Sequence, residues 1–213
     1  MTVNPEEPQA APPHPRFNAA EARQKAEFIL SRAWGLLRAP KAEWEQIRDE
    51  ETTIPNILLG YVAPLAAIPP ICDLIGSTLF NRLLQGDFAG ALMRAIITFG
   101  VSVALIYFLG LLINALAENF DGERNDLQAQ KVAAYAMTPT FFSGLFSLWP
   151  PVWWFSIFAL AYAVYLFYTG VPILMKASRE RAVGYAATVA IAGLIAFVIL
   201  FSVVGCVSGM GHV

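Results

Sequence analysis

The chain has 213 residues, of which 57% are hydrophobic and 14% are charged, with 14 Lys and Arg against 16 Asp and Glu. Soluble domains average about 45–50% apolar and about 25% charged residues, so this composition is typical of an integral membrane protein. The formal net charge of −2 excludes the basic surplus that a nucleic-acid-binding domain needs, so we expect no nucleic acid partner.

The first 16 residues form a polar, proline-rich stretch. It holds five prolines together with Glu6 and Glu7, and it lacks the basic start and apolar core of a secretory signal. We therefore predict a disordered tail at 1–16.

Residues 17–51 are predicted to form a cytoplasmic amphipathic helical segment. Asn18 and Glu21 have the spacing of a capping box, and apolar residues then recur every three or four positions until Pro40. Residues 16–41 hold six basic and two acidic groups, whereas 42–51 hold one basic and five acidic groups. The basic half could lie on anionic lipid headgroups, or the helix could pack on the cytoplasmic ends of the spans. The candidate partner or membrane-surface face consists of Ile29, Trp34, Leu37 and Trp44.

Apolar windows place the membrane spans in 52–213, because a helix needs about 20 residues to cross a hydrocarbon core of about 30 Å. Two windows predict spans at about 56–78 and 93–117. The 44 residues between Lys131 and Lys176 carry no charge and would form a helix of about 66 Å, twice the required length. Prolines among tryptophans near residue 150 divide this stretch into spans at about 131–149 and 152–175. A last window predicts a span at about 183–208.

The predicted fold class is therefore all-α: a polytopic membrane protein with a bundle of five transmembrane helices behind an N-terminal amphipathic cytoplasmic helix. With the amino terminus inside, the inner segments hold 12 of the 14 Lys and Arg, and the outer loops hold Arg82 and Arg94. Cytoplasmic loops retain such residues, so we predict a cytoplasmic amino terminus and an external carboxyl terminus. A bacterial inner membrane is the expected location.

Asp73 is the acidic residue that the apolar pattern places within or near the bilayer, where a carboxylate is costly and needs a partner. The predicted partner is Arg94, near the same outer boundary. A salt-bridged hairpin would be structural, whereas a role in moving protons, ions or a polar headgroup would make the pair functional; both interpretations stay open. Cys72 and Cys206 are expected at similar depth, and the sequence leaves their pairing open.

The sequence offers little for catalysis. His14 and His212 lie near the two ends, and no phosphate loop, HExxH or GxSxG motif occurs. We expect no enzymatic activity, no cofactor and no metal site. The acidic stretch 118–126 departs from the EF-hand spacing, and we interpret it as a solvated cytoplasmic loop.

Four segments resemble the YIP domain family, multi-pass membrane proteins named for interaction with Rab-type (Ypt) GTPases. They are LLRAPKAEWEQI before the first span, NALAENFDGE ending the second, QKVAAYAMTP opening the third and YTGVPILMK ending the fourth. The resemblance covers roughly residues 30–208 and is closest to compact prokaryotic members. It implies a five-span domain with a cytoplasmic amino terminus; the eukaryotic members are similar to adaptors in vesicle traffic.

Two functions follow as hypotheses. The first is a non-catalytic scaffold or adaptor in membrane organisation or trafficking, whose partners are the lipid bilayer and a membrane protein or a second copy of the chain. The alternative is a small transporter or lipid-handling protein that uses Asp73 and Arg94, with a substrate that the sequence does not specify. Prolines between 64 and 70 favour the alternative, because broken helices can build transport sites.

Overall fold

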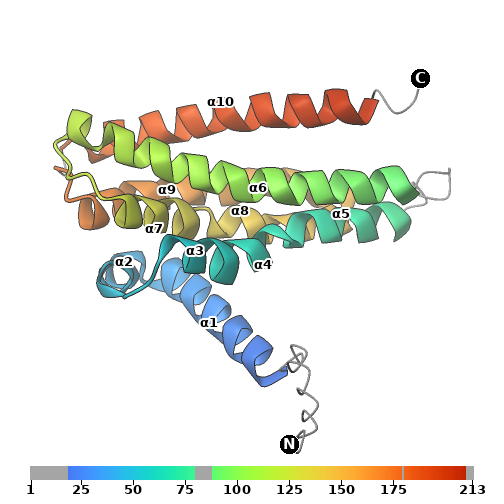
Figure 1. The fold of residues 1–213 in the computed structure, drawn as a ribbon, viewed down its shortest axis with the longest axis horizontal. Helices are drawn as coiled ribbons and strands as arrows, with labels where there is room; N and C mark the ends of the chain where they lie inside the picture. Colours follow the sequence, from blue (N-terminus) through green and yellow to red (C-terminus); the bar gives the residue numbers. More distant parts are fainter. Residues whose placement is uncertain (1–18, 80–87, 179, 210–213) are drawn as a thin grey trace, which may run out of the picture.

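The computed structural model of the chain describes residues 19–79, 88–178 and 180–209, and every regular element within these ranges is a helix. The helices form an elongated bundle, with α10 along one side and the amino-terminal helix α1 leaving the other side obliquely (Figure 1). The all-helical fold class is therefore confirmed. The tail 1–16, Asn18 and Arg82 lie outside the described residues.

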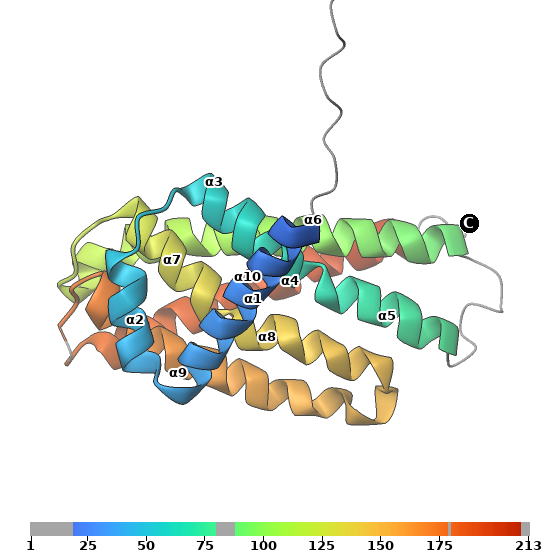
Figure 2. The same cartoon turned by 90° about the horizontal axis from the view of Figure 1, so that it is seen from below.

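Two helices precede the bundle, α1 (Ala19–Arg38) and α2 (Pro40–Asp49). Pro40 lacks an amide hydrogen and disfavours a helical residue before it, so α1 ends and Ala39 leaves the helical conformation, with φ −146° and ψ 63°. On α1 the residues Ile29, Ala33 and Leu36 recur at helical spacing and are buried. Helix α2 lies across one end of the bundle (Figures 1 and 2).

The first apolar segment is a succession of short helices: α3 (Ile54–Asn56), the π-helix η1 (Ile57–Val62), α4 (Ala63–Ala66) and α5 (Ile68–Leu79). Thr53 begins it, because its side-chain oxygen accepts a hydrogen bond from the Asn56 amide. Pro64 and Pro69 remove backbone donors inside the segment, which explains why one regular α-helix does not form.

The remaining chain runs back and forth along the bundle. Its elements are α6 (Phe88–Leu116), η3 (Ala117–Phe120), α7 (Asp126–Ala136), α8 (Thr138–Ser143), η4 (Gly144–Leu148), η5 (Pro150–Phe155), α9 (Ser156–Leu174) and α10 (Ala182–Gly209). Asn125 caps α7 by accepting a hydrogen bond from the Gln128 amide at 3.0 Å.

Four helical stretches of the described residues are long and apolar enough to cross a membrane: Ile54–Gly76, Phe88–Phe120, Ser156–Leu174 and Ala182–Ile199. They overlap the predicted spans 56–78, 93–117, 152–175 and 183–208. The predicted span 131–149 instead covers α7, α8 and η4, which are interrupted at Met137, ahead of Pro139. The count of five spans therefore stays a prediction.

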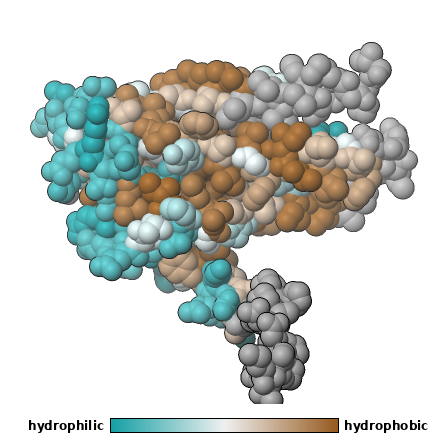
Figure 3. Space-filling view, viewed as in Figure 1, coloured by the Kyte–Doolittle hydropathy of each residue, from teal (hydrophilic) through white to brown (hydrophobic). Residues whose placement is uncertain are grey.

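Hydrophilic residues gather at the end of the bundle that holds α2, and apolar residues cover the surface along its length (Figure 3). We call this end the polar end. The connection between α6 and α7 and the connection between α9 and α10 both lie there (Figure 1). Exposed apolar side chains such as Phe108, Ile157 and Ile191 lie along the bundle and suit contact with lipid tails.

Helix α7 lies inside the bundle, and each residue from Ala129 to Ala136 is buried. It packs against α6, where Gly110 leaves room for the Gln130 side chain: a Cβ at this glycine would lie 2.2 Å from Gln130 Oε1. Gln130 Nε2 also donates to the backbone oxygen of Ile106 at 3.2 Å. The polar residues Gln130 and Lys131 at the start of the predicted third span are thus enclosed by protein.

Candidate functional site

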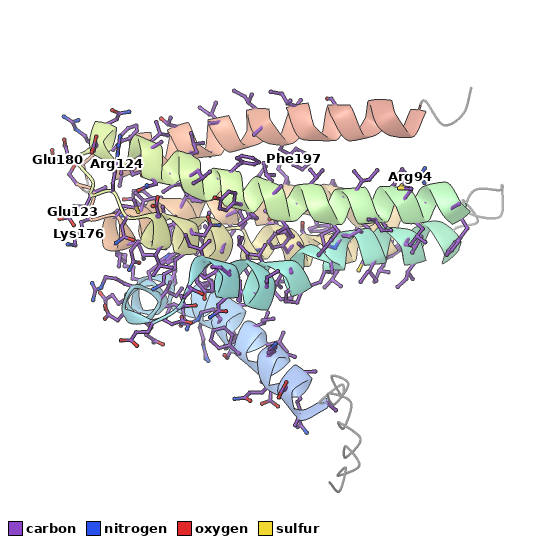
Figure 4. All side chains as sticks on the ribbon, in the orientation of Figure 1. Arg94, Glu123, Arg124, Lys176, Glu180 and Phe197 are labelled. Atoms are coloured by element: carbon purple, nitrogen blue, oxygen red, sulfur yellow. The ribbon has the colours of Figure 1, made fainter. Side chains whose placement is uncertain are left out.

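Asp73 and Arg94 lie on neighbouring helices, α5 and α6, and both side chains are exposed. Among the ion pairs of the described residues, none joins these two side chains. Arg94 lies toward the end of the bundle opposite to Glu123 and Lys176 (Figure 4). Cys72 is a buried free thiol, and the side chain of Cys206 lies outside the described ones. A role for Asp73 and Arg94 stays a prediction.

The structure divides the predicted partner face on residues 29–44 into two parts. Trp44 and Ile29 are buried against the rest of the molecule, whereas Trp34 and Leu37 are 62% and 54% exposed. The first two residues therefore hold the amino-terminal helices on the bundle, and the last two face outward.

Trp44 attaches α2 to α9. Its indole is fully buried, and Nε1 donates a hydrogen bond to Thr169 Oγ1 at 3.1 Å. Gly170 makes room for the ring, because a Cβ at that position would lie 2.7 Å from the Cε2 atom of the tryptophan. A buried indole needs a partner for its N–H, and Thr169 supplies it.

Lys131 attaches α2 to α7. The lysine is fully buried, and Nζ donates to the backbone oxygens of Ile47 at 2.7 Å, Arg48 at 3.2 Å and Glu50 at 2.7 Å. These oxygens belong to the carboxyl end of α2, where helix carbonyls lack partners within the helix and carry partial negative charge. The Lys131 ammonium on α7 thus donates hydrogen bonds to the carbonyl groups at the carboxyl end of α2.

Arg32 connects α1 to α2 and to the chain that follows α2. Its guanidinium pairs with Glu43 at 2.7 Å and with Glu50 at 2.8 Å, and the three side chains are 11%, 13% and 25% exposed. The guanidinium also lies 5.2 Å from the ring centre of Phe28 and 5.8 Å from that of Tyr135. With Lys131 nearby, two cations balance two carboxylates, so the partly buried charges neutralise each other.

We call Arg32, Glu43, Trp44, Glu50, Lys131 and Thr169 the collar cluster. Sequence patterns predicted only one of its members, Trp44, as part of a site. Lys131 had been interpreted as a span boundary, and the available signal was its position as an isolated cation at the start of an otherwise uncharged run.

The connections at the polar end form a second set of contacts. Glu123 N donates to the Met175 backbone oxygen at 2.8 Å, which joins the α6–α7 connection to the end of α9. Three exposed ion pairs surround this bond: Glu118 with Arg124, Glu123 with Lys176, and Asp121 with Arg181. Figure 4 shows Glu123, Arg124 and Lys176 gathered at this end.

The acidic stretch 118–126 therefore uses its carboxylates in contacts with protein groups. Within the described residues, no group of three or more His, Cys, Asp or Glu side chains could hold a metal ion.

On α2, the hydrogen bond from Arg48 lowers the pKa of the Asp49 carboxyl, so Asp49 stays ionised there.

Comparison with known proteins agrees with this architecture. The model of the Yip1 domain matches residues 34–200. The "Inner membrane protein YohC" of Escherichia coli strain K12 is 29% identical over 192 residues, which covers 86% of this chain and 98% of the relative. The protein of the same name from Escherichia coli O6:H1 strain CFT073 matches to the same extent. No solved structure matches the chain significantly. A family model that covers most of the sequence, together with these apolar helices, shows that the chain is a membrane protein of the Yip1 domain family.

Proposed function

We propose that the chain is a non-catalytic scaffold or adaptor of a bacterial inner membrane. It crosses the bilayer five times, with the amino terminus in the cytoplasm and the carboxyl terminus outside, and it offers the polar end of the bundle to a protein partner. The relatives named as inner membrane proteins support this location.

The path of the chain supports the odd number of crossings. Helix α6 ends and α7 begins at the polar end, whereas α9 begins at the opposite end and returns (Figures 1 and 2). The elements α7, α8 and η4 therefore lie between the two ends and form the third crossing in this proposal. Enclosure by neighbouring helices makes a broken helix at this depth tolerable, because protein groups can satisfy its backbone.

The adaptor role is supported by one observation above all: Lys131 is fully buried and its Nζ is bonded to three oxygens at the end of α2. A buried cation is costly unless it is fully partnered, so it holds the amino-terminal helices in one position. A fixed cytoplasmic surface is what a docking protein needs, since less conformational freedom is lost when the partner binds.

The outward side of α2 is the proposed docking surface. Glu45, Gln46 and Asp49 are exposed on it, while Glu43 and Glu50 are used by Arg32. Lys41 and Arg48 are exposed on α2 as well, and Arg48 pairs with Asp49, so the exposed charges of this helix are of both signs and a partner surface with both signs would complement them.

Site-specific photo-crosslinking in native membranes tests the adaptor role. A photoreactive residue at Gln46 should give one reproducible crosslinked protein, and the same residue at Ile157, which is exposed on α9 along the bundle, should not. The Lys131→Met substitution should weaken the Gln46 crosslink. Absence of any crosslinked protein at Gln46 and at neighbouring exposed positions of α2 would contradict the proposal.

The alternative function, a small transporter or lipid-handling protein, is favoured by a different observation. The first apolar segment contains the π-helix η1 (Ile57–Val62) followed by prolines, and π-helical turns occur frequently at functional sites. Asp73 follows in α5 with an exposed carboxylate. Under this alternative, Asp73→Asn abolishes a flux while the protein stays folded.

A further inference from the structure

Helix α1 carries an exposed apolar stripe that the bundle does not cover. Leu30, Trp34 and Leu37 are 59%, 62% and 54% exposed, and their spacing of four and three residues puts them on one side of the helix. The buried residues Ile29, Ala33 and Leu36 form a separate, adjacent face. The helix thus has two apolar faces, one packed on the protein and one that is more than half exposed.

Basic groups accompany this stripe. Of the four basic residues of α1, Arg32 is used in the collar cluster and Arg23 pairs with Glu27, whereas Arg38 lies beside the stripe. The Arg38 guanidinium lies 5.9 Å from the centre of the Trp34 ring, so a cation is held directly beside the exposed indole. Lys41 follows on α2 and is also exposed. A tryptophan flanked by cations is typical of the headgroup region of a bilayer.

The position of α1 suits contact with the bilayer. Its carboxyl end is hydrogen-bonded to the bundle, because Tyr162 Oη of α9 donates to the Leu36 backbone oxygen at 2.9 Å. From the polar end the helix runs obliquely away from the bundle, so its carboxyl half lies near the polar end and its amino-terminal part reaches the level of the apolar surface (Figures 1 and 3). The carboxyl half of α1, which carries Leu30, Trp34 and Leu37, therefore lies at the level of the membrane interface when the apolar surface of the bundle lies in lipid.

We propose that Leu30, Trp34 and Leu37 insert into the cytoplasmic leaflet of the protein's own membrane, so that α1 is an interfacial helix with Arg38 among the phosphates. The cytoplasmic leaflet is anionic, so the Arg38 guanidinium beside Trp34 favours this contact. The inference depends on the proposed cytoplasmic amino terminus but not on the adaptor role. It assigns α1 to lipid and leaves α2 as the surface for a protein partner.

Depth-dependent fluorescence quenching of the full chain in proteoliposomes tests this inference. Single cysteines at Leu30, Trp34 and Ser31, each in a Cys72→Ser, Cys206→Ser background, carry a small polarity-sensitive dye. Ser31 is a matched control, because it is exposed on α1 outside the apolar stripe, on the side of the helix opposite the buried face. We expect the dyes at 30 and 34 to be quenched by lipids with a nitroxide at a shallow acyl position, and at least threefold less by iodide than the dye at 31.

Two results would overturn the inference. Equal quenching of all three dyes by iodide would show that the stripe stays in water. Shielding of positions 30 and 34 from iodide without quenching by the nitroxide lipids would show that protein, such as a second copy, covers the stripe. Neither result would affect the Gln46 crosslink, so failure of this inference is distinguishable from failure of the adaptor role.

Discussion

The ammonium of Lys131 lies 2.7 Å from the backbone oxygen of Ile47, and this bond joins α7 to the end of a helix 84 positions earlier in the sequence. Arg48 and Glu50 offer their oxygens to the same ammonium, and Gln128 Nε2 also donates to the Arg48 oxygen, so two side chains of α7 bind the carboxyl end of α2. The orientation of the amino-terminal helices α1 and α2 therefore depends on a residue at the start of the predicted third span.

The substitution Lys131→Met should release α2. It removes the charge and the ammonium donor, so Glu50 O loses the bond from Lys131 while Gln128 Nε2 still donates to Arg48 O and the Glu50 amide to Ile47 O. We expect a cost of about 1–3 kcal/mol. Thermal unfolding in one detergent should show a lower midpoint, and amide hydrogen exchange should increase at 40–50 before it increases elsewhere. The control Lys41→Met removes an exposed lysine and should leave both measurements unchanged. Equal behaviour of the two variants would contradict the structural role of Lys131.

Gly170→Ala should weaken the attachment of Trp44. The added methyl group would lie 2.7 Å from the indole, so ring and helix must separate, and such overpacking costs about 1–3 kcal/mol. Gly100→Ala is the matched control, because a Cβ there meets nothing within 4 Å and Gly100 lies inside the helix α6. Unfolding midpoints should fall for the first variant and stay equal or rise for the second. A stabilised Gly170→Ala protein would show that Trp44 does not occupy this position.

Arg32 and Glu43 should be energetically coupled. In a double-mutant cycle of Arg32→Gln and Glu43→Gln, we expect a coupling of about 1–3 kcal/mol, because the pair is only 11% and 13% exposed. The exposed pair of Arg23 and Glu27 is the control, with side chains 82% and 65% exposed, and substitution to glutamine should leave stability unchanged. Additive effects at Arg32 and Glu43 would argue against the ion pair.

Asp73 and Arg94 should show no such coupling. Since no ion pair joins them in the described structure, Asp73→Asn and Arg94→Gln should have additive effects, and exchange of the two residues should rescue nothing. Unfolding midpoints of the single, double and exchanged variants measure this. Restoration by the exchange would establish the salt bridge, and loss of a measured flux in a well-folded Asp73→Asn protein would favour the transport alternative.

The sequence predicts the long apolar helices well, because hydrocarbon burial leaves a local signal in each window. Four predicted spans overlap helical stretches with suitable length and composition, and the prolines near residue 150 mark the break before α9. The interruption at Met137 was not predicted. The uncharged run at 131–149 has the length of one helix, and the structure divides it at Met137, two residues before Pro139.

The collar cluster could not be predicted, because its contacts join residues far apart in the sequence. Trp44 reaches Thr169 across 125 positions, and the burial of Lys131 depends on backbone oxygens of α2. A span prediction from charge-free windows assigns every lysine to a solvated loop at the end of a span. A lysine that is enclosed by backbone carbonyls, such as Lys131, is therefore assigned to solvent instead of the protein interior. In the same way, the predicted partner or membrane-surface face includes both Ile29 and Trp34, although tertiary packing buries the first and leaves the second exposed.

The compartment of the carboxyl terminus tests the account most directly. Five crossings put the two ends on opposite sides, whereas four crossings, with α7, α8 and η4 returning to the side of entry, put them on the same side. Fusions of a fluorescent protein that folds only in the cytoplasm and of a phosphatase that is active only outside should be made at each end of the full chain. We predict cytoplasmic fluorescence at the amino terminus and phosphatase activity at the carboxyl terminus; fluorescence at both ends would contradict the five-crossing account.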